Sequence, residues 1–167
     1  MLCPVCRHDN FEGEDYCENC GADLRTADIP ESALDYRGRL LGERLEELEP
    51  ARPLVLPAES QATEAVARMH ANAVDCVLVT DEGRLVGIFT DRDAVLKLAG
   101  RPAGPTPLRE VMTPDPVVLR HDDTIAVAIH KMAVGGFRHI PILDGGNLPV
   151  AVVSARDVFR HLAAEVV

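Results

Sequence analysis

The sequence has few aromatic residues and no tryptophan. Aromatic residues make up 4% of the 167 residues, whereas apolar residues of all kinds make up 47%. A core must therefore be built from aliphatic side chains and alanine. Apolar runs are also short, and none approaches the roughly 18 residues that span a bilayer. We predict no transmembrane helix, no membrane contact, and a chain of about one ordinary domain with a small appendage.

A secretory leader is missing from the start of the sequence. The opening residues, MLCPVC, show no basic segment followed by an apolar one, which a signal peptide would have. We therefore expect a cytoplasmic location, where a reducing environment keeps thiols free. Under that expectation, the five cysteines favour metal binding or free thiols over disulfides.

Positive charge is scarce near the N-terminus. The formal net charge is −10, and residues 1–50 hold 5 basic against 13 acidic residues, while residues 51–167 hold 12 against 14. An acidic surface repels DNA and RNA. Nucleic-acid binding, in a transcription-associated regulator, is therefore the less favoured function and stays open as an alternative.

Four of the five cysteines form two Cys-x2-Cys pairs separated by ten residues. In a cytosolic chain this spacing is typical of a tetrahedral zinc site, with two thiolates from each pair. Residues 1–24 resemble a zinc ribbon, which implies a structural Zn²⁺ and a contact with a protein or a nucleic acid. A redox role is the weaker alternative, because no thioredoxin-like context follows. The expected ligands are Cys3, Cys6, Cys17 and Cys20.

Residues 25–50 are acidic and end at Pro50. Leucines at positions 40, 41, 45 and 48 recur at helical spacing, which predicts a short amphipathic helix. We interpret this segment as an acidic helical linker, or alternatively as a helix that binds a partner.

Residues 51–167 contain two copies of one pattern. Aligning Pro53 with Pro116 sets LVLPAESQATEAVARM over VVLRHDDTIAVAIHKM at an offset of 63, and one additional turn residue then sets GIFTDRD over AVVSARD at an offset of 64. Each copy predicts a strand, a helix, two strands around a turn, and a second helix. A unit of this size buries little apolar surface alone, so we expect the copies to pack together.

The paired copies resemble a known family. VMTPDPVVL, FRHIPILD, and the T-x-x-D or S-x-x-D before each last helix look like tandem CBS (cystathionine β-synthase) domains, also called a Bateman module. The resemblance implies an α/β (α+β) fold of small three-stranded sheets with flanking helices. The two domains would occupy residues 51–104 and 105–167.

The resemblance also implies a function. CBS pairs generally sense adenosine-containing ligands, such as AMP, ADP, ATP or S-adenosylmethionine, and pass the signal to a partner. They are generally not enzymes, and this sequence shows no catalytic triad or P-loop in a recognisable context. The resemblance further implies a homodimer formed through the CBS helices.

Ligand contacts are expected where each hairpin ends. A carboxylate at a helix start can accept both ribose hydroxyls, and a hydroxyl before it can bond ribose or phosphate. Both groups can instead serve only as helix caps, and the basic residues can serve in surface ion pairs. The resemblance also points to backbone near the central strands as a partner for the adenine edge. The candidates are Thr90, Asp93 and Val77 in the first copy and Ser154, Asp157, Arg138, His139 and Ile140 in the second.

The copies differ in charge around these positions. Asp75 and Cys76 stand where the second copy has Arg138 and His139, and Asp91 adds another carboxylate to the first copy. Because like charges repel a phosphate, we predict that the second copy binds phosphorylated adenosine. The first copy would suit a neutral nucleoside or stay empty.

One sequence difference favours ligand binding by the first copy over the second. The second copy has Ala151 where the first has Gly87. A Cβ at this position would narrow the approach of a ligand to the backbone.

Overall fold

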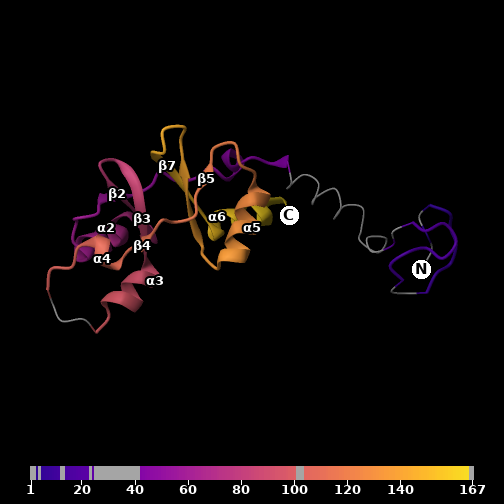
Figure 1. The fold of residues 1–167 in the computed structure, drawn as a ribbon, viewed down its shortest axis with the longest axis horizontal. Helices are drawn as coiled ribbons and strands as arrows, with labels where there is room; N and C mark the ends of the chain where they lie inside the picture. The colour runs from indigo at the N-terminus through magenta and orange to yellow at the C-terminus, as the bar shows by residue number, and fades with distance from the viewer. Residues whose placement is uncertain are drawn as a thin grey trace. The chain divides into compact units, whose positions relative to one another are not determined.

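A computed structural model describes residues 3, 5–11, 14–22, 24, 42–100 and 104–165. The chain divides into two compact units, Met1–Leu41 and Gly42–Val167 (Figure 1). Residues 25–41, most of the predicted acidic linker, lie outside the described residues. Within the described part, no helix combines the length and apolar character that crossing a bilayer requires.

The N-terminal unit has a very small core. Its buried cluster consists of Cys3, Cys17 and Leu24. Two short turns support the cysteines: the amide of Cys3 donates to the carbonyl of His8 at 2.9 Å, and the amide of Cys17 donates to the carbonyl of Ala22 at 2.8 Å. A core of this size contributes little hydrophobic stabilisation.

The first motif of the second unit is built on a four-stranded sheet in the order β1-β2-β3-β4. Strand β1 runs parallel to β2, and the other neighbours are antiparallel. Its core contains Val77, Val79 and Phe89, all fully buried. The elements are β1 (Val55–Pro57), α2 (Ala62–Asn72), β2 (Cys76–Asp81), β3 (Arg84–Thr90), α3 (Asp91–Asp93), the π-helix η2 (Ala94–Leu98), α4 (Leu108–Val111) and β4 (Thr113–Pro114).

The second motif is built on a three-stranded sheet in the order β5-β6-β7. The predicted α/β class is confirmed, and the first sheet differs from the expected three strands because β4 adds a fourth. Figure 1 shows α2 beside α4 in the first motif and α5 beside α6 in the second. The elements are β5 (Leu119–Arg120), α5 (Ile125–Gly135), β6 (His139–Leu143), β7 (Pro149–Ser154) and α6 (Ala155–Glu165), and the 3-10 helix η1 (Leu45–Leu48) precedes both motifs.

Local sequence explains the long helices. Ala62, Ala65 and Met69 form the buried face of α2 at helical spacing. Thr124 caps α5 by accepting a hydrogen bond from the backbone amide three residues on. Gly136 ends α5 with φ of 67°, a conformation that glycine adopts without strain.

The segment that precedes each motif in the sequence packs on the other motif. Strand β4 precedes the second motif but pairs with β3 of the first, with Thr113 opposite Ile88. Ala51 precedes the first motif but pairs with Val152 in β7 of the second. Helices follow the same rule, because α4 contacts α2 and β3, while η1 contacts α5 and α6.

The exchange is symmetric in its hydrogen bonds. The amide of Leu108 donates to the carbonyl of Ser60 at 2.9 Å, and the amide of Leu45 donates to the carbonyl of Asp123 at 3.3 Å. The two donors and the two acceptors are each separated by the repeat offset of 63. Residues 42–50, which the sequence-based prediction assigned to the linker, therefore contact the second motif. This exchange determines which residues of the two motifs meet.

Candidate functional site

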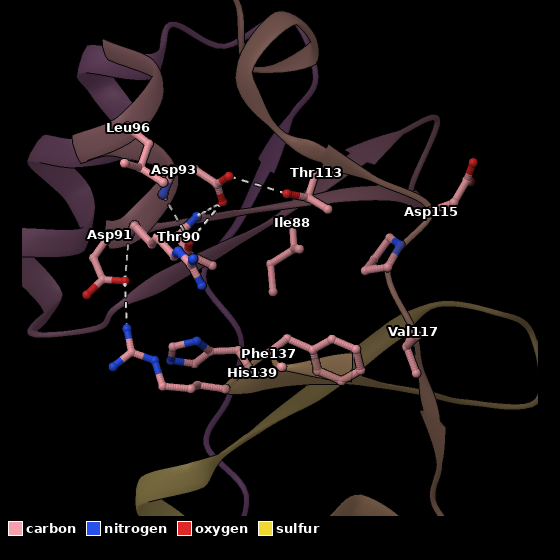
Figure 2. Close-up of a pocket in the computed structure, with 14 residues that line it drawn as sticks. Ile88, Thr90, Asp91, Asp93, Leu96, Thr113, Asp115, Val117, Phe137 and His139 are labelled. Atoms are coloured by element: carbon pink, nitrogen blue, oxygen red, sulfur yellow. Dashed lines mark hydrogen bonds and ion pairs between the residues drawn. The ribbon is translucent and has the colours of Figure 1, made fainter. Parts of the chain in front are cut away.

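A cavity of about 410 Å³ lies between the two motifs. Its volume is within the range of small-molecule sites. Figure 2 shows Thr90 and Asp91 on one side of the opening and Val117 on the other, with Ile88 and Phe137 facing each other. The cavity thus combines apolar walls with a polar group of residues around Thr90 and Asp91, and Asp115 also belongs to its lining. Its apolar lining is Ile88, Leu96, Pro116, Val117 and Phe137, and its polar lining includes Thr90, Asp91, Arg92, Asp93, Thr113, Arg138 and His139.

Thr90 and Asp93 form a complete capping box at the start of the helix that follows β3. Asp93 Oδ2 accepts from the Thr90 amide at 3.0 Å and from the Thr90 hydroxyl at 2.8 Å, while the Thr90 hydroxyl accepts from the Asp93 amide at 3.2 Å. The structural role proposed for these residues as helix caps is therefore present. A capping role and a ligand contact are compatible, because both residues also line the cavity.

Two further groups hold the other oxygen of Asp93. Lys97 Nζ lies 2.7 Å from Asp93 Oδ1, and the Thr113 hydroxyl donates to the same oxygen at 3.3 Å. Burial raises the pKa of Asp93, but the hydrogen bonds from Lys97 and Thr90 hold that pKa below its ordinary value. With four donors, the acceptor capacity of this carboxylate is filled.

Lys97 connects the capping turn to the exchanged segment. Its ammonium donates to the carbonyls of Val111 and Met112 at 2.8 and 3.2 Å. Lys97 lies in η2, and π-helical turns occur frequently at functional sites. This contact ties the cavity wall to α4 and β4.

The second motif repeats the capping box with Ser154 and Asp157. Asp157 Oδ2 accepts from the Ser154 amide at 2.9 Å and from its hydroxyl at 2.6 Å. Arg160 supplies the third bond, to Oδ1 at 2.7 Å. Asp157 therefore retains acceptor capacity that Asp93 lacks. Neither Ser154 nor Asp157 lines the cavity of about 410 Å³.

Arg138 and His139 line the cavity together with Thr90 and Asp93. They also lie beside the capping turn of their own motif, as the predicted grouping had them, because His139 is the register partner of Ser154 and the carbonyl of Arg138 accepts from the amide of Ala155 at 2.8 Å. The start of β6 therefore lies near the capping turns of both motifs. Burial lowers the pKa of His139, although nearby Asp75 raises it. The imidazole therefore offers an N–H donor at neutral pH without a full positive charge.

Two neighbouring ion pairs join the motifs, and the backbone amide of Asp91 donates to the carbonyl of Asp75 at 3.0 Å. Arg138 Nη2 lies 3.9 Å from Asp91 Oδ1, and Arg156 Nη2 lies 3.5 Å from Asp75 Oδ2. All four side chains are exposed, so each pair contributes little to the stability of the fold.

Gly87 serves packing in this structure. A Cβ on Gly87 would clash with Met112 and would lie 3.0 Å from the carbonyl oxygen of Thr113. The missing side chain therefore lets β4 approach β3, whereas the sequence suggested room for a ligand. The predicted adenine partners Val77 and Ile140 are fully buried within β2 and β6 and do not line the cavity.

Comparison with known proteins places these motifs in a family. The CBS domain model matches residues 45–100 and 108–164. The chain belongs to the CBS domain family. The CBS domain-containing protein CBSCBSPB5 of Arabidopsis thaliana is 33% identical over 136 residues, covering 79% of this chain and 25% of the relative. An uncharacterized 17.7 kDa protein of Acidianus ambivalens is 31% identical over 109 residues, covering 65% and 66%.

Solved CBS structures confirm the tandem pair. The CBS-domain containing protein ATU1752 from Agrobacterium tumefaciens superposes with a TM-score of 0.66 at 29% identity, covering 73% of this chain and 95% of that one. The CBS domain protein PAE2072 from Pyrobaculum aerophilum, complexed with AMP, gives 0.64 at 25% identity, covering 72% and 98%. The chain spans about a quarter of the length of the Arabidopsis relative.

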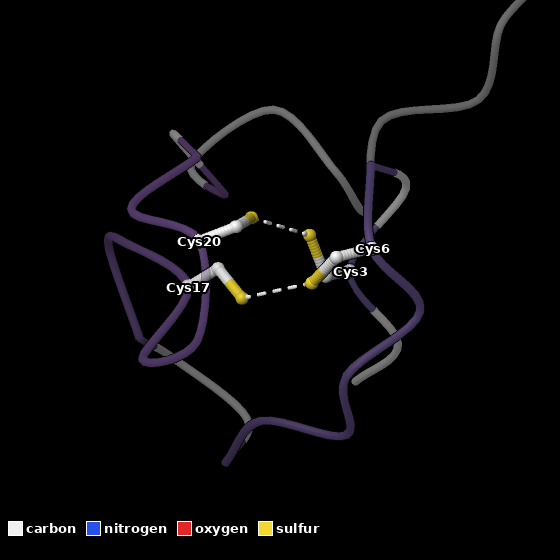
Figure 3. Close-up of side chains that lie close together, drawn as sticks. All are labelled: Cys3, Cys6, Cys17 and Cys20. Carbon is white, nitrogen blue, oxygen red and sulfur yellow. Dashed lines mark hydrogen bonds between the residues drawn. The ribbon is translucent and has the colours of Figure 1, made fainter.

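Outside the CBS pair, four thiols form a compact cluster (Figure 3). All four Sγ atoms lie within 4.8 Å of one another, with Cys3 and Cys20 3.7 Å apart and Cys6 and Cys17 3.6 Å apart. Tetrahedral Zn–S bonds of about 2.3 Å correspond to S–S separations of about 3.8 Å. The number, type and spacing of these donors fit one zinc ion.

A buried asparagine supports this cluster and was missed in the sequence. The Asn10 amide donates to the His8 carbonyl at 2.9 Å, and Asn10 Oδ1 accepts from the amide of Glu18 at 3.0 Å. Asn10 therefore bridges the two cysteine pairs. The sequence places the polar residue Asn10 between the two cysteine pairs, but no local pattern predicts that its side chain is buried.

The fifth cysteine lies in the CBS pair. Cys76 is buried at the start of β2, and burial followed by the charge of Asp75 raises its pKa to about 12. The thiol stays protonated at neutral pH and is not a nucleophile.

Proposed function

We propose that this protein is a regulator that senses an adenosine-containing ligand in the cavity between its CBS motifs. The observation that carries the proposal is the shape and lining of the cavity, which combines apolar walls with a hydroxyl and a carboxylate. A relative of the same fold, at 25% identity, is a complex with AMP. A binding and signalling role also fits a family whose members are generally regulatory.

The lining suggests one orientation for the ligand. Adenine would lie between Ile88 and Phe137, because its flat faces match their apolar surfaces (Figure 2). The ribose would meet Thr90 and Asp93. Arg138 and His139 would then lie near the 5′ substituent, with His139 as an N–H donor. In this pose Val77 and Ile140 act only by supporting the strands behind the walls.

A second binding position is proposed at the capping turn of the second motif. Ser154 and Asp157 repeat the first turn, and Asp157 keeps an acceptor position for a ribose hydroxyl. Arg156, held by Asp75, lies beside them. We place the ligand first in the described cavity because the enclosing walls are present there.

Calorimetric titration tests the sensor proposal directly. Adenosine, AMP, ATP, S-adenosylmethionine and NADH are titrated into the full chain, with guanosine as the control for base recognition. At least one adenosine compound should bind, and Asp93→Asn should weaken binding by roughly tenfold through loss of a charge-assisted hydrogen bond. Absence of heat and of ligand protection for all five compounds would reject the proposal.

We also propose that Cys3, Cys6, Cys17 and Cys20 hold a structural Zn²⁺. The ion would supply folding free energy to a unit whose described core is very small. Purified protein should contain about one zinc per chain, and Cys20→Ser together with chelator treatment should release it. Metal content well below one per chain under non-chelating conditions would contradict a zinc site. Cys76→Ser, which alters a thiol outside the cluster, is the matched control.

The zinc-ribbon unit is proposed to pass the signal to a protein partner. Val5 and Phe11 expose 73% and 78% of their surface on a unit of this small size. Its described acidic residues, Asp9, Glu14, Asp15 and Glu18, disfavour the alternative of a nucleic-acid partner. A salt-dependent electrophoretic shift of DNA or RNA would revive that alternative.

A homodimer through the CBS helices is a further part of this proposal. Large apolar side chains are exposed on helices of both motifs, namely Val95, Leu96, Val134 and Phe159. Exposed apolar groups on helices, with those of α5 and α6 on neighbouring helices, support an association surface. Light scattering should give twice the mass of one chain, and Phe159→Glu should lower it to the mass of one.

A further inference from the structure

We infer that Asp91 makes the cavity discriminate against adenosine ligands that carry a 5′-phosphate. The side chain does so by occupying Arg138, the cation that a phosphate would otherwise bind. This inference rests on the proposed binding of an adenosine ligand in the same cavity. The site would therefore favour ligands that carry a hydroxyl or a cationic group at the 5′ position.

The orientation of the ligand follows from the apolar and polar parts of the cavity lining. Val117 and Phe137 belong to the apolar part of the lining, whereas Thr90 and Asp93 present a hydroxyl and a carboxylate (Figure 2). With adenine at the apolar part and ribose at the capping turn, the 5′ substituent extends toward the next residue, Asp91.

The carboxylates of Asp91 and Asp93 each lie near a cation of their own, and Arg92 also lines the cavity. Asp91 Oδ1 accepts from the backbone amide of Arg92 at 2.7 Å and lies 3.9 Å from Arg138 Nη2. Asp93 is separately matched by Lys97 at 2.7 Å. A phosphate approaching Arg138 therefore meets the negative charge of Asp91 and must displace it. A neutral hydroxyl or a sulfonium group meets no such repulsion.

The second ion pair between the motifs, Asp75 with Arg156, supplies a matched control. Asp75 holds Arg156 at 3.5 Å, and both side chains are exposed to a similar extent as Asp91 and Arg138. Asp75 does not line the cavity. Replacing Asp75 removes the same charge and the same kind of inter-motif bond from a residue outside the lining, although that charge also acts on His139.

The experiment compares AMP with adenosine by calorimetry in the full chain. Asp91→Asn keeps the oxygen that caps the Arg92 amide and removes the charge. We expect roughly fivefold to tenfold tighter binding of AMP and an unchanged affinity for adenosine, since partly screened charges at this separation contribute about that factor. Asp75→Asn removes a charge that also acts on His139 from outside the lining, so it should give a smaller gain for AMP than Asp91→Asn and leave adenosine unchanged. Arg138→Ala in the Asp91→Asn background should abolish the gain.

Each other result overturns the inference in a recognisable way. An equal change for AMP and adenosine means that Asp91 affects the cavity as a whole. A gain with Asp75→Asn in place of Asp91→Asn means that the phosphate binds at the second motif. If wild-type protein binds AMP and adenosine but Asp91→Asn changes neither affinity, the sensor proposal stands and this inference fails. If no variant binds either compound, both fail.

Discussion

The two CBS motifs build the same capping turn and surround it differently. The hydroxyl-to-carboxylate distance is 2.8 Å for Thr90 and Asp93 and 2.6 Å for Ser154 and Asp157, and the return bond from the amide is 3.2 Å in both. The cation beside the first turn is half-buried, whereas Arg160 beside the second is exposed. The repeat therefore preserves backbone geometry, while the neighbouring charges give each turn its own properties.

The largest expected difference concerns the cores behind these turns. Phe89 in β3 and Val153 in β7 occupy equivalent repeat positions, and both are fully buried. Phe89→Ala should lower the free energy of unfolding by about 3–5 kcal/mol, and Val153→Ala by about 2 kcal/mol, because a ring leaves the larger cavity. Urea unfolding followed by circular dichroism measures both. Equal losses would show that the first core relaxes around the missing ring.

Much of this comparison can be predicted from the sequence. The offsets of 63 and 64 aligned the hairpins and both T/S-x-x-D turns, because strand alternation, helix periodicity and capping are local properties. The two Cys-x2-Cys pairs likewise predicted the thiol cluster from spacing alone. These predictions needed no knowledge of how distant segments meet.

The lining of the cavity could not be predicted in the same way. Arg138 and Thr90 line one cavity although they belong to different motifs and are distant in the chain. A pattern repeated in both copies cannot say whether a segment packs on its own motif or on its neighbour. The same limit explains Gly87, whose role depends on Met112 arriving with β4.

An intermediate effect on the free energy of unfolding is expected at the position where the first copy has Gly87 and the second has Ala151. Gly87→Ala would force Met112 to move and press on the carbonyl of Thr113, so we expect a loss of about 2 kcal/mol in unfolding free energy. Ala151→Gly should cost about 0.5–1 kcal/mol through backbone entropy. Thermal unfolding of both variants checks the ranking. A neutral Gly87→Ala variant would mean that β4 tolerates displacement.

The smallest expected effect concerns the cations beside the capping turns, and it depends on pH. Lys97→Met removes the half-buried partner of Asp93, whereas Arg160→Met removes the exposed partner of Asp157. We expect losses at pH 7 of about 1–2 kcal/mol for Lys97→Met, from an uncompensated buried carboxylate, and below about 0.5 kcal/mol for Arg160→Met. Urea unfolding of each variant against wild type measures these differences.

The pH dependence separates a charge effect from a packing effect. The pKa of folded Asp93 is lowered, with burial opposing and Lys97 and Thr90 producing the shift. Its stabilisation is therefore present above the pKa of the unfolded state and is lost as the pH falls through the folded pKa. In Lys97→Met the burial that remains raises the pKa of Asp93, so the carboxylate is neutralised at a higher pH. The difference from wild type should shrink as the pH falls through the folded pKa of wild-type Asp93, which lies below the ordinary value for an aspartate, because Asp93 is then protonated in both proteins. A difference that stays constant from pH 7 to that folded pKa would assign the role of Lys97 to its contacts with the carbonyls of Val111 and Met112, because those bonds do not titrate with Asp93.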